Sequence, residues 1–213
     1  MTRLVISLLC VAVCSLSGFA AAEGSASRVE LDDLLGAFSK MSGLEARFVE
    51  EKKMQILAVP LRSEGRLYFA PPGYLLRRIE RPQPSKVLIT PNELLVDDGV
   101  RKEVIDLGAR RDVRSFVSSF VSLLAGDKAA LEAAYAITLE PLPARRWQMA
   151  LRPKSPPLST IIREVRVTGE GLAVDEIRVF DTNGDQTTTR MLEVNPARRF
   201  NASERKALFG IED

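Results

Sequence analysis

The side chains that most often carry catalysis or hold metal ions are nearly missing from this chain. It has no histidine, and its two cysteines, Cys10 and Cys14, both lie close to the N-terminus. Beyond residue 14, therefore, no thiolate or imidazole is present to act as nucleophile, base or metal ligand. Carboxylates remain as the candidates for acid–base chemistry.

The most visible acidic groups have the spacing of turns rather than of active sites. Asp97 and Asp98 are adjacent, so on a strand they would point to opposite faces, and Gly99 follows them as in a tight hairpin. Residues 181–185 alternate as in a calcium loop but lack its later glutamate. We therefore expect no enzyme, metal or cofactor. A hydrolase that uses only carboxylates is the alternative, and it would require two buried acids that face each other.

The composition is that of a globular protein with nearly balanced charge. Of the 213 residues, 46% are hydrophobic and 27% charged, and the formal net charge is +2. This balance argues against a nucleic-acid partner. Arginine pairs at 77–78, 110–111, 145–146 and 198–199 are dispersed. We expect most of them to be solvated, and the alternative is contact with phosphates at a membrane surface or on a lipid head group.

The N-terminus has the composition of a secretory signal peptide. A positive Arg3 precedes an apolar stretch over 4–16, and three alanines at 20–22 supply a cleavage site. We expect residues 1–22 to be removed and residues 23–213 to form one domain in the periplasm. An uncleaved membrane anchor and lipidation of a cysteine in this segment are the alternatives.

Periodicity predicts a serial β protein with a few helices. A first helix is expected after Ser27, which would cap it with Glu30 in a capping box, and it should end near Gly43. Further helices are expected over 112–125, 128–134 and 203–209. Alternation and turn residues predict ten or eleven short strands. These cover 44–50, 61–69, 74–80, 85–90, 94–97, 101–107, 135–139, 147–151, 161–168, 174–180 and 186–194.

This order predicts a mainly β (α+β) fold. Serial hairpins favour a single curled antiparallel sheet that forms an incomplete barrel, and the helices are expected to close its concave side. The helix over 112–125 has an apolar face, which suits either core packing or a lid over a cavity for an acyl chain. The candidate cavity residues are Phe48, Leu67, Phe69, Phe116, Phe120, Leu124, Trp147 and Met149.

Several segments, taken in order, resemble the LolA family of periplasmic outer-membrane lipoprotein carriers. The resemblance spans about residues 28–195. Its segments are LEARFVE at 44–50, SEGRLYF at 63–69, the turn at 72–73, VLITPNELLVDDG at 87–99, and Asp181, Gly184 and Thr187 of the late hairpin.

This resemblance implies a monomeric carrier that makes and breaks no bond. Such a protein takes an acylated or lipid cargo from an inner-membrane ABC transporter or another exporter and shields the chains in a hydrophobic cavity. It then passes them to an outer-membrane acceptor. Each buried methylene would contribute about 0.8 kcal/mol to the affinity.

The chain departs from the family pattern in two places. Pro71 stands where the well-known carriers have an arginine that gates the lid, and the C-terminal segment 199–210 also differs. We therefore expect a divergent member whose cargo is a lipoprotein or another acylated molecule, such as an aryl-polyene-type product. The alternative is a non-enzymatic interaction module that binds a protein partner in a periplasmic envelope complex.

Overall fold

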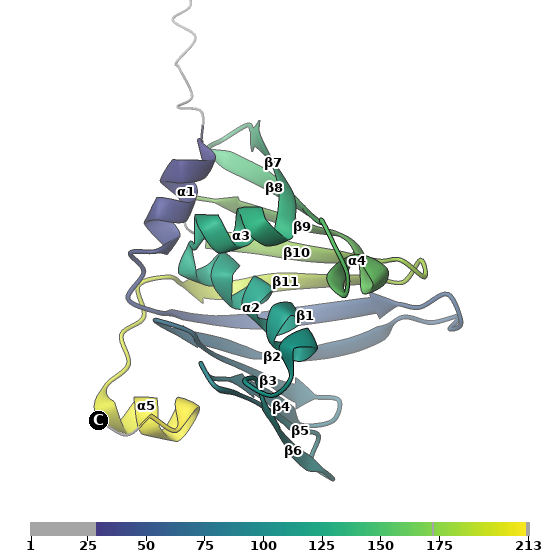
Figure 1. Cartoon of the computed structure of the whole chain (residues 1–213), viewed down its shortest axis with the longest axis vertical. Helices are drawn as coiled ribbons and strands as arrows, with labels where there is room; N and C mark the ends of the chain where they lie inside the picture. The colour runs from purple at the N-terminus through teal and green to yellow at the C-terminus, as the bar shows by residue number, and fades with distance from the viewer. Residues whose placement is uncertain (1–28, 172, 212–213) are drawn as a thin grey trace, which may run out of the picture.

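The computed structural model of the protein describes residues 29–171 and 173–211. The expected signal peptide, residues 1–22, and the expected cap residue Ser27 lie outside this part. Eleven strands of the described chain form one antiparallel sheet in the order β6-β5-β4-β3-β2-β1-β11-β10-β9-β8-β7. Figure 1 shows how this sheet curls around the helices without closing. The predicted incomplete barrel is confirmed.

All eleven predicted strands are present, with ends that differ by a few residues. They are β1 (Leu44–Lys53), β2 (Leu61–Ala70), β3 (Tyr74–Arg81), β4 (Ser85–Ile89), β5 (Glu93–Asp97), β6 (Lys102–Asp106), β7 (Tyr135–Leu142), β8 (Arg146–Pro153), β9 (Ile162–Glu170), β10 (Ala173–Asp181) and β11 (Gln186–Asn195).

The helices include one that periodicity did not predict. They are α1 (Leu31–Phe38), α2 (Arg111–Ala125), α3 (Lys128–Ala134), α4 (Leu158–Ile161) and α5 (Ala202–Phe209). The short α4 lies between the predicted strands over 147–151 and 161–168, where no helix was expected. The predicted capping box of α1 is wrong, because Glu30 is itself the N-cap residue and its side chain makes no capping hydrogen bond. The helix also ends at Phe38, well before Gly43.

The acidic turns predicted from the sequence are hairpin connections. Asp98 Oδ1 accepts the backbone N–H groups of Val100 at 2.9 Å and Arg101 at 2.7 Å, which closes the β5–β6 turn. These hydrogen bonds lower the pKa of the Asp98 carboxyl. Residues 181–185 connect β10 to β11. Both acidic clusters therefore lie at hairpin connections.

At the centre of the sheet, the first strand of the chain pairs with the last one. Strand β1 pairs with its neighbour β2 on one side and with the much later β11 on the other, which places Phe48 between Gly65 and Met191. Sequence patterns predicted both strands but not this pairing. It brings residues of the first and last hairpins to one concave surface.

Apolar side chains pack in two clusters on the concave side of the sheet. The first lies between α1, α3 and the strands β7–β9, and it includes Leu35, Phe38, Leu131, Trp147 and Met149. The second lies under α2 against β1–β4, and it includes Phe48, Leu67, Phe69, Leu75 and Val117.

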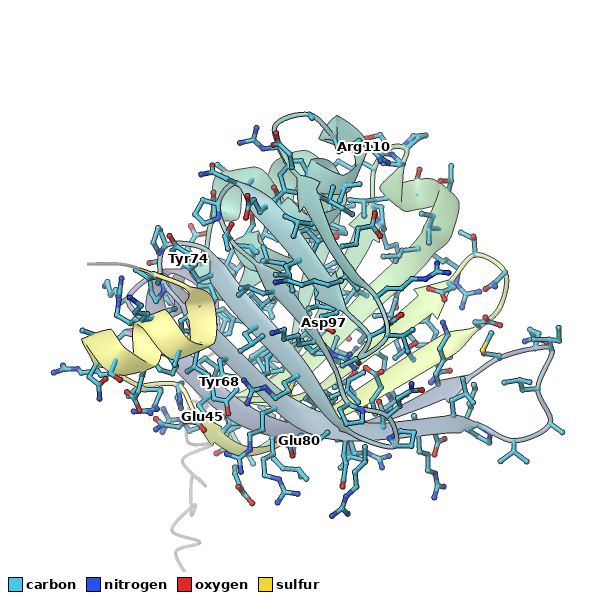
Figure 2. The ribbon with its side chains drawn as sticks, turned by 90° about the horizontal axis from the view of Figure 1, so that it is seen from below. Glu45, Tyr68, Tyr74, Glu80, Asp97 and Arg110 are labelled. Atoms are coloured by element: carbon cyan, nitrogen blue, oxygen red, sulfur yellow. The ribbon has the colours of Figure 1, made fainter. Side chains whose placement is uncertain are left out.

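A third cluster lies on the convex side, under α5. Leu67 and Phe69 face the concave side from β2, whereas Tyr68 between them faces outward and packs with Phe209 of α5. Figure 2 shows α5 against this outer face, beside Tyr68 and Tyr74. The prediction that the helices lie on the concave side is right for α1, α2 and α3 but wrong for α5.

Candidate ligand-binding cavity

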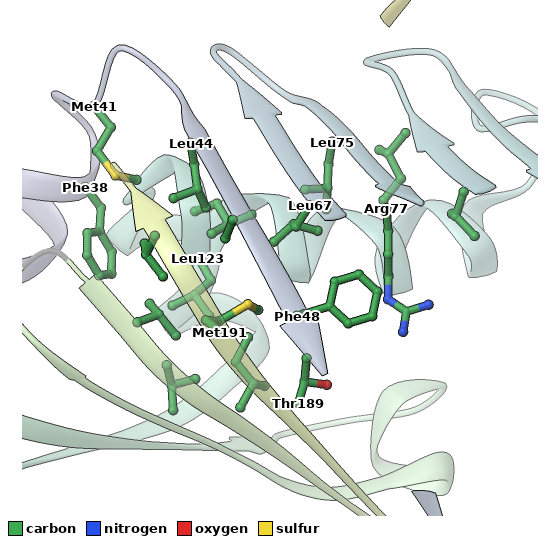
Figure 3. A pocket seen from close by; sticks show the side chains of 18 residues that line it. Phe38, Met41, Leu44, Phe48, Leu67, Leu75, Arg77, Leu123, Thr189 and Met191 are labelled. Carbon is green, nitrogen blue, oxygen red and sulfur yellow. The ribbon is translucent and has the colours of Figure 1, made fainter. Parts of the chain in front are cut away.

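A cavity of about 330 Å³ lies between the concave face of the central strands and the helices α1 and α2. Of its 18 lining residues in the described chain, sixteen are apolar. The lining residues are Phe38, Met41, Leu44, Ala46, Phe48, Leu67, Leu75, Arg77, Val87, Ile89, Leu123, Leu124, Val167, Val174, Ile177, Thr189, Met191 and Val194 (Figure 3).

Strand alternation explains why the sheet contributes most of this lining. Leu44, Ala46 and Phe48 are every second residue of β1, and successive side chains of a strand point to opposite faces. Leu67 of β2 and Met191 of β11 flank Phe48 from the neighbouring strands. The hollow therefore runs across the middle of the sheet rather than along one hairpin.

Three of the eight residues predicted from the sequence line the cavity. They are Phe48, Leu67 and Leu124. Phe69 is buried beside the cavity in the cluster under α2 but is not part of the lining. Phe116 and Phe120 belong to α2, and their side chains lie outside the described part of the structure.

Trp147 and Met149 are placed in the packed core instead. Both are fully buried in the cluster of β7–β9. The Trp147 ring meets the Phe38 ring edge-on at 6.1 Å between centroids, and its Nε1 donates a hydrogen bond to the Gly171 carbonyl at 3.1 Å. Gly169 leaves the room for this ring, because a Cβ there would lie 2.6 Å from Trp147 Cζ2. The indole is thus held by specific contacts.

One end of the cavity is polar, a feature that the sequence analysis did not predict. The guanidinium carbon of Arg77 lies 4.5 Å from the centroid of the Phe48 ring, a cation–π arrangement. Arg77 Nη2 lies 2.8 Å from Glu50 Oε1. Thr189 Oγ1 donates to Glu50 Oε2 at 2.8 Å. Figure 3 shows Arg77 and Thr189 at the same end of the hollow, next to Phe48.

Arg77 is the single charged residue among the described lining residues. Its Nη2 is buried against the Glu50 carboxylate in this ion pair, which leaves the other guanidinium N–H groups. A guanidinium can donate five hydrogen bonds, so donor capacity remains for a ligand. Arg77 is an exception to the expectation that most of the paired arginines are solvated, because its side chain is only 29% exposed. Strand alternation with Leu75 could have shown its inward position.

The helices over the cavity are joined into one unit. Gly126 caps α2 with φ +65°, and a Cβ there would lie 2.1 Å from the carbonyl oxygen of Leu35 in α1. Lys128 of α3 pairs with Asp32 of α1. The turn that carries Pro71 lies close to α2, since a Cβ on Gly73 would be 3.5 Å from Val121 Cγ1.

The sequence comparison identifies the family to which this curled open sheet with an apolar hollow under its helices belongs. The family model described as outer membrane lipoprotein carrier protein LolA-like matches residues 22–205. The chain therefore belongs to this LolA-like family, as the resemblance predicted. Members of the family are carriers or binding modules rather than enzymes. No curated protein sequence matches the chain significantly.

Solved structures with this fold are distant in sequence. A LolA superfamily protein from Nitrosomonas europaea is 8% identical, with a TM-score of 0.43, and the match covers 82% of this chain and 96% of that one. A DUF1329 family protein from Desulfovibrio piger is 12% identical, with a TM-score of 0.47 and coverages of 84% and 96%. A chain of the MucA/MucB complex of Pseudomonas aeruginosa is 10% identical, with a TM-score of 0.48. The match covers 82% of this chain and 60% of that one.

No helix within residues 29–171 or 173–211 has the length and apolar composition needed to cross a bilayer.

Proposed function

We propose that this protein is a periplasmic carrier that holds the acyl chains of a lipoprotein or another acylated lipid in its cavity. The observation that carries this proposal is a hollow with sixteen apolar lining residues under the helices. Its volume of about 330 Å³ lies near the lower end of the usual range for small-molecule sites, about 300–1,000 Å³. Burial of methylenes, at about 0.8 kcal/mol each, supplies the affinity.

The polar end of the cavity suits the polar group that joins or ends an acyl chain. Arg77 offers N–H donors there, and the ester or amide carbonyl of an acylated molecule, or a carboxylate, accepts such hydrogen bonds. The Phe48 ring and the apolar lining behind it receive the chain itself. In this proposal Arg77 orients the cargo, and the rest of the cavity contributes most of the affinity.

The carrier would act as a monomer in the periplasm, between an inner-membrane ABC transporter or other exporter and an outer-membrane acceptor. Membership of the LolA-like family supports this route. The chemistry is limited to burial and release, which needs no nucleophile and is consistent with the lack of histidine throughout the chain.

Two phenylalanine substitutions on the same strand test the cavity. Ala46 is buried and lines the hollow, whereas Val49 is exposed on the opposite face of β1. A46F should weaken the binding of a fluorescent fatty-acid probe at least tenfold, and V49F should leave it within about twofold. Thermal unfolding checks that both variants are folded, and L67W replaces A46F if the latter is not. No binding by the wild type, or equal effects of A46F and V49F, would contradict the proposal.

The interaction-module alternative gives a different result in native mass spectrometry. Protein isolated from its own periplasm should carry a lipid-sized mass if it is a carrier. Recovery of one stoichiometric protein partner together with an empty cavity would favour the interaction module instead.

A further inference from the structure

The connection between β1 and β2 exposes a cluster of large aliphatic side chains. Ile56, Leu57, Val59 and Leu61 have exposed fractions of 83%, 42%, 72% and 53%. We call residues 54–61 the apolar tip; it projects from one end of the sheet (Figure 1 and Figure 2). Scattered exposed aliphatic residues are ordinary, but four within six residues form a contiguous patch, and such patches mark interaction surfaces.

The apolar tip is held in place by specific hydrogen bonds. The backbone N–H of Gln55 donates to Asp185 Oδ1 at 2.9 Å, and Gln55 Nε2 donates to the Gly184 carbonyl at 3.1 Å. The backbone N–H of Leu57 donates to the Met54 carbonyl at 3.0 Å. Asp185 itself is buried. The turn of β10–β11 thus supports the base of the tip, and its aliphatic side chains are presented outward by a defined backbone.

The segment that carries the apolar tip contains only basic charged residues, while Glu51 and the carboxylates of Asp181 and Asp185 lie at its foot. Residues 52–62 (KKMQILAVPLR) contain Lys52, Lys53 and Arg62 and no acidic residue. Glu51 lies behind the tip, 3.8 Å from Lys53 Nζ and 3.4 Å from Arg62 Nη2. The side chains of Lys53 and Arg62 remain mostly exposed at 64% and 77%. Aliphatic side chains at the end of the tip and cationic side chains at its foot match the two layers of an anionic bilayer. The acyl region would receive the aliphatic side chains, and the negative head groups above it would contact the cations.

We propose that the apolar tip inserts into the interface of an anionic lipid bilayer and docks the protein on the membrane surface. This inference concerns a site separate from the cavity and does not depend on what the cavity holds. Lys53 lies five residues beyond Phe48 on β1, which corresponds to about 17 Å along the strand. Docking by the tip therefore turns the Arg77 end of the cavity toward the bilayer.

Vesicle flotation tests the docking with a matched control. The purified wild-type protein should float with vesicles of phosphatidylcholine mixed with phosphatidylglycerol. The double variant Ile56→Asn, Val59→Asn should reduce this binding about tenfold or more, because it removes two aliphatic side chains from the insertion. The control is Val100→Asn, which changes an equally exposed valine (82%) at the β5–β6 turn and should leave binding within about twofold.

Lipid composition and salt test the basic part of the proposal. Binding should be weaker to vesicles of phosphatidylcholine alone and should fall as the salt concentration rises. The proposal is overturned if the wild type binds neither kind of vesicle, which would leave a protein partner for the tip. It is also overturned if V100N lowers binding as much as the double variant, or if neutral vesicles bind equally well. The acyl-probe affinity of the double variant should equal that of the wild type, so failure of docking is distinguishable from failure of the carrier proposal.

Discussion

The concave face of one continuous sheet is solid in one half and hollow in the other. Over β7 and β8, Trp147 and Met149 are fully buried, and the Trp147 ring packs edge-on against Phe38 of helix α1. The hollow begins next to them, where Phe38 and Val167 of β9 line it. Over β1–β3, Phe48 and Leu67 face a cavity that α2 covers with Leu123 and Leu124. Strands with the same alternation of apolar side chains can therefore border either a packed core or a cavity. The helices packed over the strands determine which of the two forms.

The convex faces of the two halves differ in the opposite sense. Behind the solid half, Glu164 of β9 lies between Arg152 at 2.8 Å and Arg166 at 2.5 Å, so that this surface carries charge. Behind the hollow half, α5 covers the strands with Phe209 against Leu76. The half with less packing inside thus has an additional apolar layer outside.

The largest expected effect comes from the solid half. Trp147→Ala removes a fully buried indole together with its hydrogen bond to Gly171, and it should lower the free energy of unfolding by about 3–5 kcal/mol in urea denaturation. Phe48→Ala should cost less stability, because one side of that ring already faces a cavity. An equal or larger loss for Phe48→Ala would break the comparison.

A matched pair of methionines sharpens the contrast. Met149→Ala in the solid half should cost about 2–5 kcal/mol, the usual range for a buried methionine. Met191→Ala lies at the cavity and should cost clearly less, since little packing is lost, but it should change the affinity for acyl probes of different length. Chemical denaturation and probe titration measure the two effects separately, and identical stability losses would contradict the prediction.

The polar end of the hollow half is tested by Arg77→Met. This change should weaken binding of a fatty-acid methyl ester about tenfold, which is about 1.4 kcal/mol, and leave the affinity for an alkane probe nearly unchanged. Arg78→Met, on the opposite face of β3, is the control and should alter neither. Equal binding of both probes by wild type and R77M would remove Arg77 from the cargo site.

The smallest expected change in stability concerns the charged residues on the convex face of β8 and β9. Burial opposes ionisation of Glu164, but the hydrogen bonds from Arg166 and Arg152 outweigh it and lower the pKa of this carboxyl below its ordinary value of 4.5. The stabilisation is therefore complete above pH 4.5 and is lost as the pH falls through the lowered pKa. Glu164→Gln should lower stability by on the order of 1 kcal/mol near neutral pH. Thermal unfolding curves should converge for the two proteins in acid, and a constant difference would contradict this assignment.

Much of this architecture was predictable because local patterns determine it. Alternation identifies the strands, and the residues around Asp98 and at 181–185 identify two hairpins. The face of each side chain follows from the same pattern, and Phe48, Trp147 and Met149 all lie on the concave side. What alternation does not give is the position of a strand across the sheet.

Strand order explains why two expected cavity residues lie elsewhere. From β1 the sheet continues through β11, β10 and β9 to β8, so the strands of Phe48 and Trp147 are four strand spacings apart, about 19 Å measured across the sheet. The pairing of β1 with β11 joins segments far apart in the sequence and brings Met191 to the cavity. Arg77 was missed for another reason, since arginine is normally a surface residue and only its alternation with Leu75 indicates the inward position.

The outer helix α5 has a consequence for how the cavity responds when it is empty. Arg198 connects Glu45 of β1, at 2.9 Å, to Glu204 of α5, at 2.5 Å, and Glu45 stands between two residues that line the hollow. These ion pairs tie β1 to α5 and so brace the curvature of the strands from the convex side. For a ligand that enters a hollow held in shape in this way, the entropy of ordering the site would not reduce the affinity.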